Sequence, residues 1–319
     1  MKILVTGGAG FVGSHIVDRL VTEGYKVRVV DNLSSGRFEN LRQWLSEKCI
    51  ELIPADLRDL DAAFRVVEDI EVVFHFAANP EVRVSVTDPE THFTNNVVAT
   101  FNLLEAMRRW DVKEIIFASS SSIYGESRGY PVGEEAAVRP VSVYGASKAA
   151  CENIMHAYAM LYNIRAVILR YANIVGPRLR HGVVWDFINK LLANPRRLEI
   201  LGDGKQLRSY MYITDAVEAT MMAWKKTHEN YRVYNVASVD WITVDEVADI
   251  VIETMKLKNV EKVYKPVLHG IGWLGDVKRI VLEIDSIREL GFEPKMKSKQ
   301  AVAKTVIELL NEIGKNQNK

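Results

Sequence analysis

The chain has 319 residues, and its 41 Lys and Arg residues balance 41 Asp and Glu residues, so the formal net charge at pH 7 is zero. This balance, without a long basic run, offers no electrostatic surface for nucleic acid, so we predict no nucleic-acid partner and favour a small phosphorylated ligand. No apolar segment reaches the length of about 18 residues that a membrane span needs, and Met1 leads directly into a strand-like run. We therefore predict neither a signal peptide nor a membrane segment, and a cytoplasmic location.

The length allows one large domain or two modest ones. The two cysteines, Cys49 and Cys151, lie far apart and form no Cys-x-x-Cys pattern. We therefore predict neither a disulfide framework nor a structural zinc site, and no bound metal.

The N-terminus has the pattern of a strand, a glycine-rich loop and a helix, over residues 2–6, 7–13 and 14–22. The loop reads Gly7-Gly-Ala-Gly-Phe-Val-Gly13. Glycines allow a pyrophosphate to approach the backbone N–H groups and the positive end of the following helix. The strand and helix on either side are the context that this motif requires, so we interpret it as a dinucleotide-binding loop. The alternative is a plain tight turn.

A second strand is predicted over residues 26–30 and ends at Asp31-Asn32. Asp31 follows the last glycine by close to the usual spacing of about 20 residues, where a carboxylate accepts hydrogen bonds from both ribose hydroxyls. Such a carboxylate would repel a 2′-phosphate, which favours NAD over NADP, although Arg28 and Arg37 lie nearby in sequence. The alternative for Asp31 is a turn residue at a strand end.

Strands and helices then alternate, which predicts an α/β fold with a doubly wound parallel sheet of the Rossmann type. The predicted strands cover residues 50–53, 72–76 and 114–118, and the predicted helices cover residues 60–68 and 93–110. Cofactor contacts belong at the carboxyl ends of such strands. The residues found there are Asp56-Leu57, Ala77-Ala78-Asn79 and Ser119-Ser-Ser-Ser122. Each of these, taken alone, is equally well explained as a turn or a packing contact.

Tyr144 and Lys148 are four residues apart on a predicted helix that begins near Pro140 and Ser142. Residues at this spacing share one helix face. A fixed ammonium beside a phenol favours the phenolate, so we expect Lys148 to lower the pKa of Tyr144 and make it a general base. The alternative is a chance pair on a solvated face.

Beyond a strand predicted at residues 166–170 the alternation weakens. A basic turn with Arg178, Arg180 and His181 comes first. The remaining predicted elements are helices from residue 184 and over residues 216–224, 244–255 and 300–313, and a strand over residues 233–236.

Taken together, the motifs resemble those of the extended short-chain dehydrogenase/reductases, most closely the UDP-galactose 4-epimerases, over essentially the whole chain. They are Thr6-Gly-Gly-Ala-Gly-Phe-Val-Gly13, Asp31-Asn-Leu, Asp56-Leu, Phe76-Ala-Ala, Asn95-Asn-Val97, Ser119-Ser-Ser-Ser-Ile-Tyr-Gly125, Tyr144-Gly-Ala-Ser-Lys148, Arg170-Tyr-Ala-Asn173 and Arg208-Ser-Tyr-Met-Tyr-Ile213. The resemblance implies a Rossmann domain of residues 1–170 with about 211–237. It also implies a smaller C-terminal α/β substrate-binding domain of residues 171–210 and 238–319.

The resemblance also implies roles for individual residues. Ser120, Tyr144 and Lys148 would be catalytic, and Ser120, Tyr144, Asn173, Arg208 and Asp276 would contact the nucleotide sugar. Lys148 would bond the nicotinamide ribose as well as act on Tyr144. The residues that would hold NAD are Gly7, Gly10, Phe11, Val12, Asp31, Asn32, Asp56, Leu57, Ala77, Asn96, Tyr144, Lys148 and Tyr171.

The implied activity is UDP-glucose/UDP-galactose 4-epimerisation, by transient oxidation at C4 with Tyr144 as base and rotation of the 4-keto sugar. Alternatives are an epimerase of UDP-N-acetylhexosamines or UDP-glucuronate, a 4-ketoreductase, or a non-catalytic protein that senses or binds NAD. Retention of Ser120, Tyr144 and Lys148 disfavours the last. Dehydratases of the family carry an Asp-Glu pair where this chain has Ser121 and Ser122, which disfavours elimination. Related decarboxylases often carry a glutamate at the position of Ser122. Because this chain has a serine there, decarboxylation is disfavoured too.

The chain departs from the family pattern at Trp273, where an arginine commonly contacts phosphate. We expect Lys278 or the group Arg178, Arg180 and His181 to replace it, the alternative being a solvated basic turn. Ile280 stands where some relatives have an aromatic residue that narrows the sugar pocket, so N-acetylated sugars could also enter. By resemblance, we expect a homodimer formed through the helices near residues 93–110 and 142–162.

Overall fold

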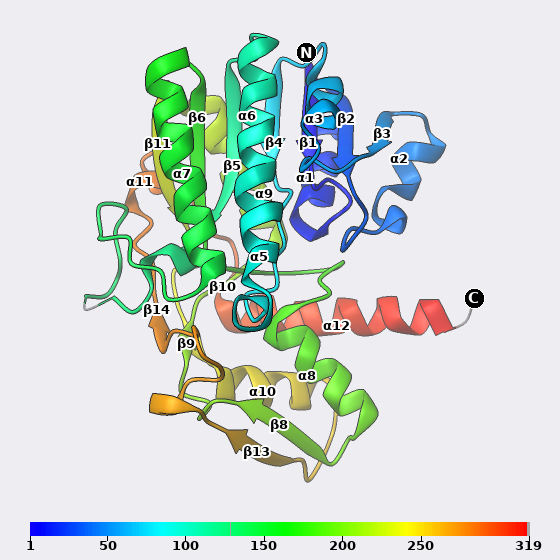
Figure 1. The fold of residues 1–319 in the computed structure, drawn as a ribbon. Helices are drawn as coiled ribbons and strands as arrows, with labels where there is room; N and C mark the ends of the chain where they lie inside the picture. The colour runs from blue at the N-terminus through cyan, green and yellow to red at the C-terminus, as the bar shows by residue number, and fades with distance from the viewer. Residues whose placement is uncertain (128, 318–319) are drawn as a thin grey trace.

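The computed structural model describes residues 1–127 and 129–317. Its centre is a seven-stranded parallel sheet in the order β11-β6-β5-β4-β1-β2-β3, as Figure 1 shows. The strands are β1 (Lys2–Thr6), β2 (Lys26–Asp31), β3 (Ile50–Pro54), β4 (Val72–His75), β5 (Glu114–Ser120), β6 (Arg165–Tyr171) and β11 (Tyr231–Val236). The strand order reverses at β1, as in doubly wound folds, so the predicted fold class is confirmed.

Helices cover both faces of this sheet. The helices α1 (Phe11–Thr22) and α9 (Ile213–Lys226) pack against each other on one face. The helices α3 (Leu60–Val67), α6 (Ala99–Arg109) and α7 (Val143–Tyr162) cover the other. Successive strand residues point to opposite faces, so Ile3 and Val5 belong to one core and Leu4 to the other. Both faces of the sheet are thus buried, as parallel sheets require.

The helix predicted over residues 93–110 is wrong in its details. The structure has a short helix α5 (Pro89–His92), a π-helical turn η2 (Phe93–Val98) and then α6. A π-helical turn inserts one extra residue and turns the later side chains to a new direction. The pattern of apolar residues does not reveal such an insertion.

The chain leaves the central sheet after β6 and returns to it at β11. The intervening and following residues form small sheets: β7 (Asn173–Val175) with β10 (Tyr210–Tyr212), β8 (Arg197–Leu201) with β13 (Glu261–Lys265), and β9 (Leu207–Arg208) between β12 (Ile242–Thr243) and β14 (Arg279–Ile280). Their helices are α8 (Gly182–Ala193), α10 (Val244–Thr254) and α12 (Ser298–Gln317). In Figure 1 this part lies below the carboxyl ends of the central strands. The division into two domains at the predicted boundaries stays a prediction.

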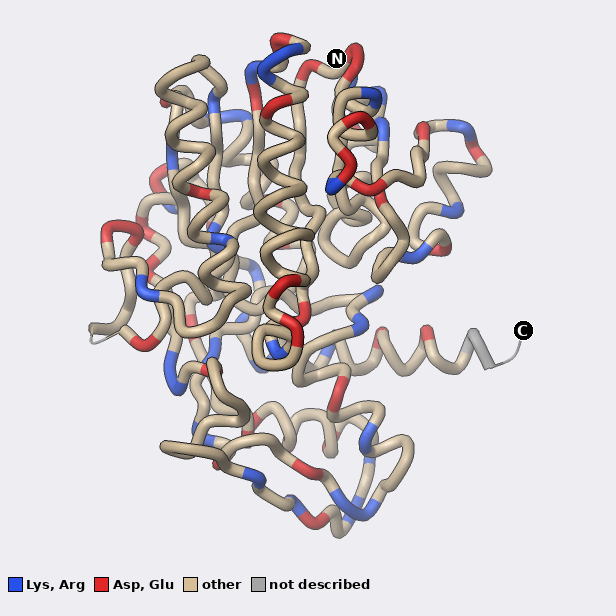
Figure 2. The backbone as a smooth tube through the Cα atoms, viewed as in Figure 1, with Lys and Arg blue, Asp and Glu red and all other residues tan. Residues whose placement is uncertain are grey.

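The remaining elements are short. They are η1 (Phe38–Leu41), α2 (Arg42–Ser46), α4 (Val84–Thr87), η3 (Ser121–Tyr124), η4 (Leu268–Gly270) and α11 (Asp285–Arg288). Lys and Arg are interspersed with Asp and Glu along the whole backbone in Figure 2. Among residues 1–127 and 129–317, no helix combines the length and the apolar character needed to cross a membrane.

Candidate active site

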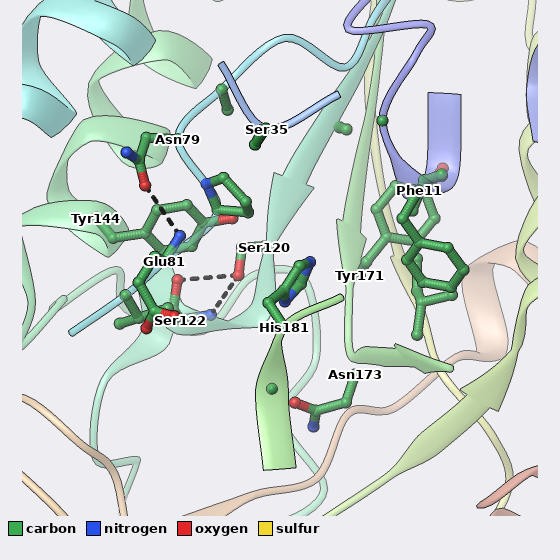
Figure 3. A pocket seen from close by; sticks show the side chains of 18 of the residues that line it. Phe11, Ser35, Asn79, Glu81, Ser120, Ser122, Tyr144, Tyr171, Asn173 and His181 are labelled. Atoms are coloured by element: carbon green, nitrogen blue, oxygen red, sulfur yellow. Dashed lines mark hydrogen bonds between the residues drawn. The ribbon is translucent and has the colours of Figure 1, made fainter. Parts of the chain in front are cut away.

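A cavity of about 970 Å³ lies where the carboxyl ends of the central strands face the C-terminal segments. Its volume is at the upper end of the range for ligand sites, about 300–1,000 Å³. Figure 3 shows Tyr144, Ser120 and Ser122 at one end and Phe11 and Tyr171 at the other. The predicted site residues that line it are Gly7, Gly10, Phe11, Val12, Asp31, Asn32, Asp56, Leu57, Ala77, Ser120, Tyr144, Lys148, Tyr171, Asn173, Arg208 and Asp276.

The glycine loop joins β1 to α1 and brings the start of that helix to the cavity. Gly7 has a φ of +66°, and a Cβ there would lie 2.6 Å from Ala77 N, so the tight turn requires glycine. A Cβ on Gly13 would lie 2.2 Å from Gly7 O. Gly10 differs, because its added Cβ would meet only Gly7 O, at 3.1 Å, and Gly10 faces the cavity. The room at Gly10 is therefore left for a ligand rather than filled by the loop.

The start of α1 supplies hydrogen-bond donors to the same place. The first intrahelical bond runs from Ser14 N–H to Gly10 O, at 3.1 Å. The N–H groups of Phe11, Val12 and Gly13 precede that bond and have no intrahelical acceptor. They and the positive end of the helix suit a pyrophosphate, so the loop fits a dinucleotide.

Asp31 is the last residue of β2, and its carboxylate is fixed by backbone donors. Its Oδ2 accepts from Ala9 N–H at 2.9 Å and its Oδ1 accepts from Leu33 N–H at 2.8 Å. Burial raises the pKa of Asp31, while these two hydrogen bonds act in the opposite direction. Each carboxylate oxygen keeps a further lone pair for a ribose hydroxyl.

Tyr144 and Lys148 lie in the first turns of α7, which begins after Ser142. The Ser142 side chain caps the helix by accepting from Gly145 N–H at 3.1 Å. The Lys148 Nζ donates to Ala118 O at 2.8 Å, and burial lowers the pKa of Lys148 to about 8. This places the lysine beneath the carboxyl end of β5, where Ser120 also lies.

The expected lowering of the Tyr144 pKa by Lys148 is wrong for this structure. Burial raises the pKa of Tyr144 to about 12, because the phenolate would lose its hydration. The Ser120 hydroxyl acts in the lowering direction, and Lys148 is not among the groups that shift it. Ser120 is in turn held by Ser122, whose Oγ and N–H both donate to Ser120 Oγ, at 2.9 and 3.2 Å.

Asn96 differs from the other predicted cofactor residues, because it does not line the cavity. It is buried in the π-helical turn η2. Its Oδ1 accepts from Asn79 N–H at 2.9 Å, and its Nδ2 donates to Ser147 Oγ at 2.8 Å. Asn96 therefore joins the loop after β4 to the helix that carries Tyr144. Its predicted contact with NAD stays a prediction.

A buried ion pair beneath the site was not predicted. Arg170 donates to both carboxylate oxygens of Glu152, and its Nη1 also donates to Tyr124 Oη at 2.8 Å. Ser119 Oγ donates to the same carboxylate. Glu152 is one helical turn beyond Lys148, and Arg170 precedes Tyr171 at the end of β6. The feature of the sequence that could have indicated this pair is the position of Glu152 four residues after Lys148, on the same helix face.

Arg208, on β9, also lines the cavity. Its Nη2 donates to Asp276 Oδ1 at 2.9 Å. Trp273 lines the cavity nearby, and its indole nitrogen is buried without a hydrogen-bond partner. Lys278 does not replace the missing arginine, because its Nζ bonds Asp203 and Gly270 O, away from the cavity lining.

The basic turn was the other group expected to replace the arginine that is missing at Trp273, and this turn does reach the cavity. Arg178, Arg180 and His181 all line it. Arg178 forms an ion pair with Asp18 at 2.9 Å and Arg180 pairs with Glu312. Both guanidinium groups thus already have carboxylate partners.

Residues 3–237 match the NAD dependent epimerase/dehydratase family. The chain belongs to this family. Its relatives include a putative UDP-glucose 4-epimerase of Methanocaldococcus jannaschii, 38% identical over 95% of this chain and 97% of the relative. A crystal structure of a UDP-galactose 4-epimerase is 47% identical, with a TM-score of 0.89, over 98% of this chain and all of the other.

The Thermus thermophilus UDP-glucose 4-epimerase, solved in complex with NAD, is 36% identical with a TM-score of 0.85, over 97% of this chain and 98% of the other. The family match and the glycine loop agree, and NAD is the cofactor of this chain. Other family members act on different sugars. One is a UDP-N-acetylglucosamine 4-epimerase of Methanobrevibacter ruminantium, 32% identical with a TM-score of 0.86 over 98% of each chain. Another is a probable UDP-glucuronate 4-epimerase of Rhizobium meliloti, 30% identical over 96% of each.

Proposed function

We propose that this protein is an NAD-dependent UDP-glucose/UDP-galactose 4-epimerase. The observation that carries the proposal is the meeting of Ser120, Tyr144 and Lys148 at one end of a cavity that continues to the glycine loop and to Arg208. A nucleotide sugar and a dinucleotide can therefore reach the same acid/base group. The similarity to UDP-glucose and UDP-galactose 4-epimerases supports the choice of reaction.

The proposed roles follow from the positions of the side chains. The glycine loop and the start of α1 hold the pyrophosphate of NAD, Asp31 holds its adenosine ribose, and Lys148 holds the ribose next to the reacting ring. Bound NAD supplies the hydride acceptor, and its positive ring favours an anionic Tyr144. Arg208 and Asn173 grip the nucleotide diphosphate, which leaves the sugar as the loosely held part.

The proton moves between the substrate and Tyr144. The phenolate removes the proton of the sugar 4-hydroxyl, and Ser120 orients that hydroxyl by a hydrogen bond. Loss of this proton, together with the C4 hydride that bound NAD would accept, gives a 4-keto sugar. The keto sugar turns about its bond to the diphosphate and presents its other face. Hydride from the reduced cofactor would then return to the opposite face of C4, which inverts its configuration, and Tyr144 returns the proton to the oxygen. The cofactor ends each cycle as it began, so tight retention of NAD is expected.

Neighbouring side chains favour this reaction over elimination. Ser121 and Ser122 follow Ser120 in η3, and neither can serve as a carboxylic acid or carboxylate. The hydroxyl of Ser122 is also engaged with Ser120. A second candidate is the UDP-N-acetylhexosamine 4-epimerase reaction, because the aliphatic Ile280 lines the cavity where a bulkier aromatic would narrow it.

The direct test is to incubate the purified protein with UDP-galactose without added cofactor and to separate the products. Formation of UDP-glucose to a constant ratio supports both the reaction and retained NAD. Conversion that needs added NAD supports the reaction with weaker retention. No conversion in either case contradicts the proposal, and UDP-N-acetylglucosamine is then the next substrate to test.

We also propose that the protein forms a homodimer through α6 and α7. Large apolar side chains on these helices are exposed, among them Phe101, Met160 and Leu161. Pairing of these two helices with their copies would bury them as a four-helix interface. Sedimentation of the wild-type protein and of Leu161→Glu tests this, since a monomer in both cases contradicts it.

A further inference from the structure

The loop after β4 forms one wall of the reactive end of the cavity, and it is tied to α7. Tyr144 N–H donates to Ser85 Oγ at 3.0 Å. At the other end of the loop, Asn79 N–H donates to Asn96 Oδ1, and Asn96 reaches α7 through Ser147. In Figure 3, Asn79 and Glu81 lie at the Tyr144 end, away from Phe11 and Tyr171. Side chains of this loop therefore face the reacting sugar rather than the adenosine of the cofactor.

Two charged side chains of this loop line the cavity and pair with each other. Arg83 Nε donates to Glu81 Oε1 at 2.9 Å, and Arg83 Nη2 donates to Glu81 Oε2 at 3.2 Å. His181 and Asp186, at the start of α8, line the cavity as well. Burial acts to raise the pKa of Glu81, but the hydrogen bonds from Arg83 lower it, and the same pairing raises the pKa of Arg83. The Glu81–Arg83 pair thus holds two opposite charges at the wall of the cavity.

The other arginines near the sugar also have carboxylate partners. Arg178 pairs with Asp18, Arg180 with Glu312, and Arg208 with Asp276. A fifth arginine of the lining, Arg37, lies on the loop after β2. Its backbone N–H donates to Ala9 O, close to Asp31. Among the residues that the structure describes, the sugar end of the cavity therefore offers no arginine whose charge is left to balance an additional carboxylate.

We propose that the Glu81–Arg83 pair makes the site selective for neutral hexoses and excludes uronic acids, with Glu81 as the specificity-determining residue. This inference rests on the proposed 4-epimerase function. Glu81 balances the charge of Arg83 through its Nε and Nη2 groups, and it places a carboxylate where a uronate would need a cation.

The physical reason is the cost of an unpaired charge at a wall of the cavity, reduced in part by solvent because the Glu81 and Arg83 side chains are 36% and 46% exposed. A carboxylate at C6 loses hydration when the sugar enters, and it must find a cation to compensate. Here it would meet the Glu81 carboxylate, and contact between like charges at an interface costs several kcal/mol. The sugar must also present both faces during epimerisation, so its C6 substituent cannot stay at one place in the cavity. A repulsive element such as Glu81 then provides specificity without any additional contact to the preferred sugar.

The test compares kcat/KM for UDP-galactose and for UDP-glucuronate in four proteins: wild type, Glu81→Gln, Glu81→Gln with Arg83→Gln, and Glu293→Gln. In the wild type, we expect the uronate to be disfavoured by on the order of 100-fold. In Glu81→Gln, the free Arg83 should raise the uronate-to-hexose ratio by about tenfold. The double variant should lose this increase in the uronate-to-hexose ratio, because it lacks the Arg83 guanidinium. Glu293→Gln, which breaks a pair with Arg288 whose two members do not line the cavity, should leave the ratio unchanged.

Several outcomes would overturn the inference. These are a wild-type ratio near one, no change in Glu81→Gln, or an equal change in Glu293→Gln. The NAD content and melting temperature of each variant show whether it is folded, and inhibition of the UDP-galactose reaction by UDP-glucuronate measures uronate binding independently of turnover. Failure of the proposed function is distinct: the wild type would then not convert UDP-galactose at all, whatever it does with the uronate.

Discussion

The Nζ of Lys148 lies 6.0 Å from the centre of the Tyr144 ring, although the two residues share one face of α7. The ammonium instead donates to Ala118 O. Burial dominates the ionisation of both groups, raising the pKa of Tyr144 and lowering that of Lys148. The base is therefore not activated by the protein alone, and a positively charged ring in the cavity would have to complete the activation.

Replacing Tyr144 by Phe should lower the rate of epimerisation by about 10²–10⁴-fold, the usual contribution of a general acid/base. The NAD content should stay close to that of the wild type, because the glycine loop and Asp31 are untouched. Tyr124→Phe is the matched control, since Tyr124 bonds Arg170 and Asn235 away from the reacting sugar. The Tyr124→Phe variant should lose about 1–3 kcal/mol of its free energy of unfolding and should retain turnover. Normal turnover by Tyr144→Phe would show that another group is the base.

Replacing Ser120 by Ala should move the pH dependence of kcat/KM. The hydrogen bond from Ser120 lowers the pKa of Tyr144, so its loss raises that pKa. The rate depends on the phenolate, and the rising limb of the profile should therefore shift to higher pH. A pH series with UDP-galactose measures this, with Ser121→Ala as the control that keeps the limb in place. A shift to lower pH would contradict the arrangement.

Two glycines of the loop should respond differently to alanine. In Gly13→Ala the new Cβ would meet Gly7 O at 2.2 Å, so the melting temperature should fall markedly. In Gly10→Ala the nearest atom is at 3.1 Å, and the fold should be nearly unaffected while NAD binding weakens. Thermal unfolding and titration with NAD separate the two effects. If Gly10→Ala binds NAD normally, the pyrophosphate does not lie against Gly10.

Replacing Arg208 and replacing Lys278 should have different effects on the KM for UDP-galactose. Arg208 lines the cavity, and Lys278 is held by Asp203 outside it. Arg208→Ala should raise KM for UDP-galactose by about tenfold or more, the scale of one charged hydrogen bond. Lys278→Ala should leave KM unchanged. An effect of equal size in both would place the diphosphate near Lys278 instead.

His75 should make the protein sensitive to acid. It is fully buried, with Thr6 Oγ1 at 2.6 Å from Nδ1 and Thr100 Oγ1 at 2.8 Å from Nε2. Burial lowers its pKa to about 3 from 6.5. The unfolded chain therefore binds this proton between pH 6.5 and 3 while the folded protein does not, so stability falls as pH falls through that window. His75→Gln should reduce the slope of unfolding free energy against pH by about 1.4 kcal/mol per pH unit. Urea unfolding between pH 4.5 and 7 measures it, and equal slopes in both proteins would contradict the assignment.

Much of the central sheet could be predicted because its strands are short apolar runs separated by helical patterns. The same reasoning could place Asp31 and Ser120, since the carboxyl ends of parallel strands meet at one edge, whereas Tyr144 was placed by its spacing to Lys148 on a predicted helix. The π-helical turn at Phe93–Val98 could not be predicted, because one inserted residue leaves the apolar pattern almost unchanged. That turn decides where Asn96 points.

The pKa values of buried side chains and the ion-pair partners of the arginines could not be predicted from the sequence either. The spacing of Tyr144 and Lys148 predicts their shared helix face but not the burial that controls their pKa values. The partners of Arg178 and Arg180 come from α1 and α12, far away in the sequence. Glu81 and Arg83 are near neighbours in the chain, yet their place in the cavity depends on how the loop after β4 is tied to α7.

The pairing of β6 with β11 affects how the protein folds. These strands are neighbours in the sheet, and residues 172–230 are looped out between them. The chain must close that long loop before the pair can form, and closure of long loops slows folding because its entropic cost precedes any gain in contacts. Asn173, Arg178 and Arg208 all belong to the looped-out segment. We therefore expect the sugar half of the cavity to form late, after the glycine loop and the first five strands have already assembled a place for the dinucleotide.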